Sequence, residues 1–193
     1  MAIDRTLGAA MNAPYELGPM PTDRSMTTVD EHRTTAPLEV IFDLAADVER
    51  WTAHLSHYRY VRFQERRSDG GGLVEMSANR PFGVVDWPTF WTSEMSVTRP
   101  GSPRPPSIRF RHVQGVTKGM DVEWTFSSSK NETLVRIVHV WNGPRWPLIG
   151  DVAARGVIGP VFVHGIASRT LAGLAHAAER RATDASRIEV SSG

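Results

Sequence analysis

The sequence predicts an α+β domain in which one long C-terminal helix lies across a curved antiparallel sheet. Two observations support this fold class. Apolar residues recur at helical spacing from Asp151 to Ala182, and a period of two prevails from Tyr58 to Trp141. Helical and strand patterns that follow one another in long blocks, without regular alternation, are typical of α+β architectures.

Small residues dominate the apolar arc of the predicted helix. The arc consists of Val161, Val163, Ile166, Ala167, Leu171, Leu174, Ala175, Ala177 and Ala178, and the polar side or border consists of Arg169, His176, Glu179 and Arg180. A face rich in alanine leaves room beside a sheet, so we expect a cavity there. Gly159-Pro160 predicts a kink or restart, because proline removes a backbone donor and clashes with the preceding turn.

Seven strands are predicted, with Gly-rich or Pro-rich segments between several of them. They are Met26 to Thr34, Tyr58 to Arg67, Leu73 to Arg80, Thr89 to Arg99, Ser107 to Gln114, Met120 to Ser128 and Thr133 to Trp141. Short connections join the last six, which predicts an antiparallel meander, because a parallel return needs a crossover of about a dozen residues or more. Arg80 to Gly83 and Asp86 to Pro88 are expected to form a stiff aromatic loop.

Two short helices are predicted between the first and second strands. Thr35-Ala36-Pro37 opens the first helix, because proline is favoured near the first helical position. Asp47 is a candidate N-cap for the second helix, Val48 to Leu55, which carries Trp51 and Leu55 on one side.

Most of the chain is expected to form one domain. Its 193 residues, 40% of them hydrophobic, suffice for a single core. We expect a helix-and-sheet domain over residues 25–183, a mobile N-terminal arm over residues 1–24 and a flexible tail over residues 184–193. The arm contains Pro14, Pro19 and Pro21 and shows no sustained period.

Composition argues against several classes of partner. The chain has 22 Lys plus Arg and 21 Asp plus Glu. Its net charge is therefore too small to attract nucleic acid or acidic lipid. The absence of cysteine excludes disulfides, thiolate metal sites and a cysteine nucleophile. No signal-peptide pattern or long apolar run is present, so we expect a cytoplasmic protein without integral membrane association. No nucleotide-binding or hydrolase motif is present. We expect no cofactor and no metal, and a homodimer is left open.

Aromatic and imidazole side chains are the candidate site residues. Alternation places Trp124 on the apolar face of its strand and Trp141 on the same face as His139. His139 and His164, the latter inside the helix arc, could meet in the cavity, where a neutral imidazole can accept a proton from a phenol or an enolising carbon. Packing in an ordinary core is the alternative for each of these residues. His54 and His57 are three residues apart, but no third metal ligand follows at a defined spacing.

The segment from Ala36 to Arg66 carries a family resemblance. Its features are Ala36-Pro37 at the helix start, the run from Asp47 to Trp51, and Tyr58 at the start of the second strand. The segment resembles the START-like (SRPBCC) superfamily, in particular its polyketide cyclase/dehydrase and coenzyme Q-binding branch, and the resemblance extends from Met26 to Arg181. It implies a helix-grip fold, in which a seven-stranded sheet wraps the long helix around a deep apolar cavity for a hydrophobic ligand.

The resemblance also implies site residues. Tyr58 matches a tyrosine that polyketide aromatase/cyclases place in the pocket as proton donor or ligand anchor. The pocket arginine of these enzymes is matched by Met95, whose thioether cannot polarise a carbonyl, and Arg80 or Arg111 could substitute for it. The catalytic candidates are therefore Tyr58, His139 and His164. The ligand-binding candidates are Trp51, Arg80, Trp87, Trp91, Met95, Arg111, Trp124 and Trp141.

Two functions remain open at this point. One is a cyclase, aromatase or dehydrase acting on a polyketide-like intermediate, and the other is a non-catalytic carrier or chaperone for a quinone or lipid. Both require a hydrophobic, aromatic or polyketide-like small molecule in a deep cavity. The cyclase also needs polar groups inside that cavity, whereas the carrier needs only apolar volume and an entrance.

Overall fold

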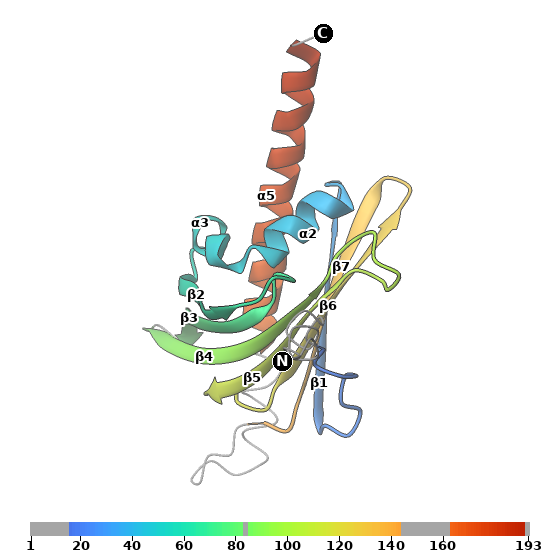
Figure 1. Ribbon diagram of the computed structural model, residues 1–193. Helices are drawn as coiled ribbons and strands as arrows, with labels where there is room; N and C mark the ends of the chain where they lie inside the picture. The colour runs from blue at the N-terminus through green and yellow to red at the C-terminus, as the bar shows by residue number, and fades with distance from the viewer. Residues whose placement is uncertain (1–15, 83–84, 144–162, 192–193) are drawn as a thin grey trace, which may run out of the picture.

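A computed structural model describes residues 16–82, 85–143 and 163–191 of the chain (Figure 1). The elements within these residues are β1 (Met26–Thr34), α2 (Leu38–Ala46), η1 (Val48–Arg50), α3 (Trp51–His54), β2 (Tyr58–Arg66), β3 (Gly72–Phe82), β4 (Val85–Thr98), β5 (Ser107–Gly115), β6 (Asp121–Ser129), β7 (Glu132–Trp141) and α5 (His164–Ser191).

The strands form one antiparallel sheet in the order β1-β7-β6-β5-β4-β3-β2. Strands β2 to β7 make the predicted meander, and β1 pairs with β7 over its whole length, from Met26 opposite Trp141 to Thr34 opposite Thr133. The sheet curves around α5, with α2 and α3 beside the helix (Figure 1). The predicted α+β class and helix-grip fold are therefore confirmed.

The β3–β4 hairpin is longer than predicted. The segments that we expected to form an aromatic loop pair with each other, with Arg80 opposite Trp87 and Phe82 opposite Val85. Strand β4 pairs with β5 only from Trp91 onward, so the preceding residues lie at a sheet edge, where Pro88 removes no ladder hydrogen bond to β5.

The two short helices follow the first strand as predicted, but the second is split into η1 and α3. Trp51 and Leu55 are both buried. Asp47 is the N-cap residue of η1 as predicted, but its side chain makes no capping hydrogen bond. Its carboxylate lies 3.7 Å from the Nε of Arg50 instead, in an exposed ion pair.

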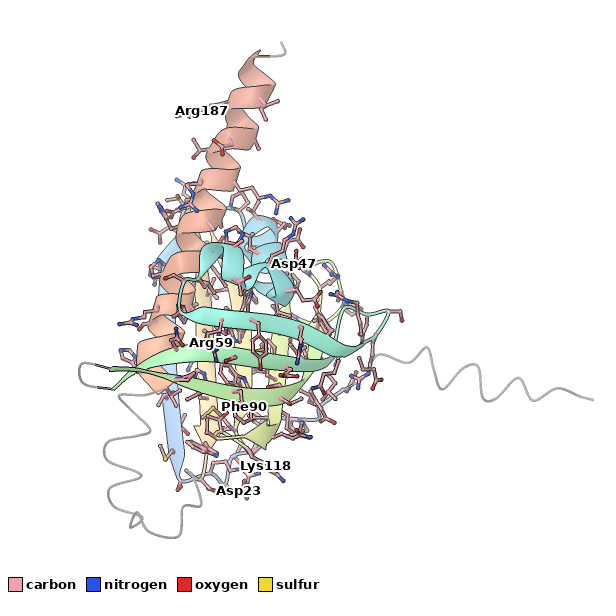
Figure 2. The ribbon with its side chains drawn as sticks, turned by 90° about the vertical axis from the view of Figure 1, so that its left-hand side faces the viewer. Asp23, Asp47, Arg59, Phe90, Lys118 and Arg187 are labelled. Atoms are coloured by element: carbon pink, nitrogen blue, oxygen red, sulfur yellow. The ribbon has the colours of Figure 1, made fainter. Side chains whose placement is uncertain are left out.

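The long helix buries the predicted face. The buried residues on this face are Val163, Ala167, Leu171, Leu174, Ala175, Ala177 and Ala178. The helix continues to Ser191, beyond the expected end at Ala182, and its last turns, which carry Arg187, project beyond the sheet (Figure 2). Part of the segment expected to be a flexible tail is thus helical. Residues 144–162, which include the predicted Gly159-Pro160 kink and Val161, lie outside the described residues.

Helix α5 is held mainly at one edge of the sheet and by α2. The Glu179 carboxylate accepts hydrogen bonds from the Thr34 hydroxyl at 2.9 Å and from the Thr35 backbone N–H at 3.2 Å. The Thr34 hydrogen bond is the largest cause of the lowered pKa of Glu179, so it stabilises the ionised form of this carboxylate. None of the described helices is long and apolar enough to cross a membrane.

Residues before β1 pack against the outer face of β5. Leu17 is buried, its carbonyl accepts a hydrogen bond from Arg111 at 2.8 Å, and the Gly18 carbonyl accepts one from Arg109 at 2.8 Å. The part of the predicted mobile arm that the structure describes is therefore attached to the sheet. Arg111 also donates to the Asp121 carboxylate at 3.0 Å.

A bulge in β5 shapes the concave face. Thr92 lies opposite Gln114 and Ser93 lies opposite His112, so one residue of β5 is left without a partner on β4. Gly115 follows with φ of 90°, and a Cβ at this position would lie 2.3 Å from the Phe90 carbonyl oxygen. The chain then turns back so that the backbone N–H of Gly119 donates to the His112 carbonyl at 2.8 Å.

Gly115→Ala is expected to destabilise the fold through both the left-handed backbone and the clash with β4. The first effect costs roughly 1 to 2 kcal/mol and the second roughly 1 to 3 kcal/mol. Gly119→Ala is the matched control, because its φ is 85° and a Cβ there would meet nothing within 4 Å. Urea unfolding should give the lower midpoint for Gly115→Ala. Equal midpoints for the two variants would contradict the close approach of β5 to β4.

Candidate functional site

A cavity of about 60 Å³ lies between α5 and the concave face of the sheet. This volume holds only a few water molecules, at roughly 10 to 15 Å³ each. It is far below the roughly 300 to 1,000 Å³ of typical ligand pockets. The deep cavity that we expected is therefore largely filled, because tryptophan side chains occupy the room left by the alanines of α5. A ligand of polyketide size must displace part of this wall.

Three tryptophans, Trp51, Trp91 and Trp124, form much of the wall. The rings of Trp51 and Trp124 have centroids 5.7 Å apart and are tilted by 32°. The Trp51 indole N–H donates to the Leu44 carbonyl at 3.2 Å, whereas that of Trp124 makes no hydrogen bond within the described part of the chain. Tyr58 meets Trp51 edge to face at 5.1 Å and also lines the cavity.

His112 and Thr117 form a buried polar pair on the same wall. The Nδ1 of His112 lies 2.6 Å from the Thr117 hydroxyl, and the imidazole stacks on Trp91 with centroids 5.9 Å apart. We did not predict His112, although alternation along β5 places it on the apolar face with Ile108 and Phe110. Arg111, which we selected on this strand, faces the opposite side.

The two histidines that we expected could meet in the cavity have different surroundings. His139 lies on the cavity wall, with Nδ1 3.3 Å from the Thr28 hydroxyl. The His164 side chain is 64% exposed and contacts the buried carboxylate of Asp30 on β1. Because β1 is the edge strand, a side chain that lies over it at the start of α5 stays open to solvent. Burial raises the pKa of Asp30, and the contact with His164 opposes that rise.

Three further ligand-binding candidates lie away from the cavity wall. Met95 is fully buried in the core, and Arg111 binds Asp121 and the Leu17 carbonyl on the outer face. Trp141 is buried, and its indole N–H donates to the Lys118 carbonyl at 3.1 Å. The side chains of Arg80 and Trp87 lie outside the described ones.

Helix α5 contributes one polar residue to the cavity, Thr170. Its hydroxyl lies 3.0 Å from the Nε2 of His57, whose ring is 4.8 Å from that of Tyr58. His57 is therefore engaged with the cavity wall and does not form a site with His54. Among the described residues, no three His, Asp or Glu side chains are grouped so that they could hold a metal ion.

A family model described as polyketide cyclase / dehydrase and lipid transport matches residues 34–159. The chain belongs to this family. No curated protein sequence matches the chain significantly.

Solved structures share the fold at low sequence identity. The protein TTHA0849 from Thermus thermophilus is 17% identical with a TM-score of 0.67, over 81% of this chain and 99% of that chain. The ZhuI aromatase/cyclase from Streptomyces sp. R1128 is 17% identical with a TM-score of 0.60, over 81% and 94% of the two chains. A START superfamily protein from Mycobacterium smegmatis is 16% identical with a TM-score of 0.57, over 82% and 97%. Similarity at this level shows the helix-grip fold.

Trp124→Ala tests whether this side chain belongs to a ligand-binding wall. Truncating a fully packed aromatic residue costs about 3 to 5 kcal/mol. We expect Trp124→Ala to cost less than Trp141→Ala, because Trp124 borders a void and loses no hydrogen bond. Affinity for a hydrophobic fluorophore should fall in Trp124→Ala and persist in folded Trp141→Ala. Severe destabilisation of Trp124→Ala with unchanged affinity would make Trp124 a core residue.

Proposed function

We propose that the protein binds a hydrophobic, aromatic or polyketide-like small molecule between α5 and the sheet and promotes its cyclisation or dehydration. The observation that carries this proposal is the presence of Tyr58, His112 and His139 on the wall of a cavity that is lined, apart from two threonines, by apolar side chains. Polar groups are costly in such surroundings unless they are paired, and a carrier for a lipid chain needs none of them. Membership of the polyketide cyclase / dehydrase family supports the same class of ligand.

The three side chains are suited to proton transfer at a poly-β-ketone. A methylene group between two carbonyls is acidic, so a neutral imidazole of His112 or His139 can accept its proton. The resulting enolate carbon forms the new C–C bond at a second carbonyl carbon. The oxygen of that carbonyl then takes a proton from the Tyr58 hydroxyl, which stabilises the developing charge.

Dehydration would follow with the same groups. The imidazolium formed in the first step returns its proton to the new hydroxyl, which leaves as water. Loss of a second proton from the adjacent carbon to the Tyr58 phenolate restores the phenol and forms the double bond. The protein ends in its starting protonation state, and no oxidant or cofactor is needed for this sequence.

The aromatic wall favours planar products. Trp51 and Trp124 present broad apolar surfaces to the cavity, and aromatic side chains in contact prefer offset or tilted arrangements at about 4.5 to 7 Å. A growing aromatic ring can stack on these surfaces better than a flexible chain can. Stacking would thus hold the reacting carbons near the polar groups and exclude water from the enolate.

The test is the product spectrum of a linear poly-β-ketone incubated with the protein. We expect the wild type to divert it from the spontaneous products, and Tyr58→Phe, His112→Asn or His139→Asn to slow that diversion, by about 10²- to 10⁴-fold for a residue that transfers the proton. His176→Asn is the control, because His176 is exposed on α5.

A non-catalytic carrier gives a different result in the same assay. It binds the ligand in the cavity but leaves the spontaneous product spectrum unchanged. An unchanged spectrum together with measurable ligand binding would overturn the catalytic part of the proposal and leave the carrier function.

A further inference from the structure

We propose that the hydroxyls of Thr117 and Thr170 bind two oxygen atoms of the ligand, and that a histidine behind each hydroxyl lets it act as donor or as acceptor. This inference rests on the proposed function, since it assumes an aromatic ligand in the cavity. It assigns two polar subsites and a ligand class: planar molecules that carry oxygen at two separate positions, as ketone or as hydroxyl.

Thr170 differs from the other hydroxyl residues of α5 whose hydrogen bonds are seen. Ser168, Thr183 and Ser186 each donate to the carbonyl four residues earlier, at 2.8, 2.9 and 3.1 Å. This is the usual arrangement for a hydroxyl on a helix surface. Thr170, which is only 1% exposed, lies on the cavity wall, and its hydroxyl is bonded to His57 at 3.0 Å. Its hydrogen bonding is therefore directed away from its own helix.

Thr117 repeats this arrangement on the sheet side of the cavity. It lies in the turn between β5 and β6, is 1% exposed and is bonded to His112 at 2.6 Å. The turn is fixed by the backbone hydrogen bonds from Gly119 to His112 and from Met120 to Thr117, at 2.8 and 3.1 Å. One hydroxyl thus comes from the helix wall and one from the sheet wall.

Each hydroxyl keeps hydrogen-bonding capacity after it has met its histidine. A threonine hydroxyl has one donor hydrogen and two acceptor lone pairs. When the ring nitrogen donates, the hydroxyl hydrogen remains available for a ligand carbonyl. When the ring nitrogen accepts that hydrogen, the lone pairs remain available for a ligand hydroxyl. The same subsite can therefore hold an oxygen in the keto form and in the enol or phenol form.

This property fits a ligand whose oxygens change between ketone and phenol, and it separates two ligand classes. A polycyclic phenol, a quinone or a cyclising polyketone can place one oxygen at each threonine while its rings lie against the tryptophans. A fatty acyl chain carries its oxygens at one end and can satisfy only one of the two hydroxyls. The other hydroxyl would keep its hydrogen bond to histidine but gain none from the ligand, so an acyl chain gains less from this site than a ligand with two separate oxygens.

Binding of small naphthalene derivatives tests the inference. The probes are naphthalene, a naphthol, a dihydroxynaphthalene with its hydroxyls on different rings, and a naphthoquinone. The chain contains no cysteine, so the quinone cannot react with a thiol of the protein. Isothermal titration calorimetry of the wild type should show that the affinity for the probe rises from naphthalene to the dihydroxy compound. We expect Thr117→Val and Thr170→Val each to lose about tenfold for the dihydroxy compound and the quinone, and to keep their affinity for naphthalene.

Two controls separate the hydroxyl from packing. Thr170→Ser restores the hydroxyl without the methyl group and should recover most of the affinity lost in Thr170→Val. Thr183→Val removes an exposed hydroxyl that is bonded within α5, and it should bind all four probes like the wild type.

Three results would overturn the inference. Equal affinity of the wild type for naphthalene and the dihydroxy compound would do so, and this comparison needs no variant. Val variants that bind the oxygenated probes normally, or a Ser variant as weak as the Val variant, would also do so. In each of these cases the cavity still binds aromatic ligands, so the proposed function stands. If the wild type binds no probe, the proposed function falls and this inference falls with it.

Discussion

The packing of α5 against β1 and α2 determines the rest of the site. The helix is attached at one flank by hydrogen bonds from Thr34 and Thr35 to Glu179, and its small buried residues bring it close to its neighbours. The backbone of α5 approaches β1 and α2 more closely than it approaches the central strands, so large side chains fill the space over the concave face of these strands. Aromatic rings are the largest of these side chains, and the small cavity is the space that they leave.

Strand β5 carries functional contacts on both faces of the sheet. Along β5, Phe110 and His112 face the cavity, while Arg109 and Arg111 on the other face bind the carbonyls of Gly18 and Leu17. The strand that carries the buried His112–Thr117 pair is thus fixed from behind by the segment before β1. This arrangement gives a cavity with rigid polar groups on the sheet side and a helix of small residues on the other. A ligand larger than the cavity therefore has to enter by shifting α5 or the tryptophan rings.

The fold was predictable because its signals are periodic. The apolar arc of the long helix and the alternation that turns Trp124 inward follow directly from the positions of apolar residues. Features that depend on contacts between segments distant in the sequence could not be predicted from periodicity. His164 belongs to the apolar arc by periodicity, yet it lies over an edge strand and meets Asp30. Thr117 and Thr170 are ordinary threonines in the sequence, and only the approach of His112 and His57 distinguishes them. His112 was predictable, because alternation along β5 places it on the apolar face with Ile108 and Phe110.

The central claim is that ligands bind between α5 and the concave face of the sheet. The indole N–H signals in the amide NMR spectrum test it most directly, because each tryptophan gives its own signal. On titration with a dihydroxynaphthalene, the signals of Trp51, Trp91 and Trp124 should shift, since all three rings line the cavity. The Trp141 signal should shift least, since Trp141 does not line the cavity and its N–H is bonded to the Lys118 carbonyl. Shifts confined to Trp141, with Trp124 unchanged, would contradict the account.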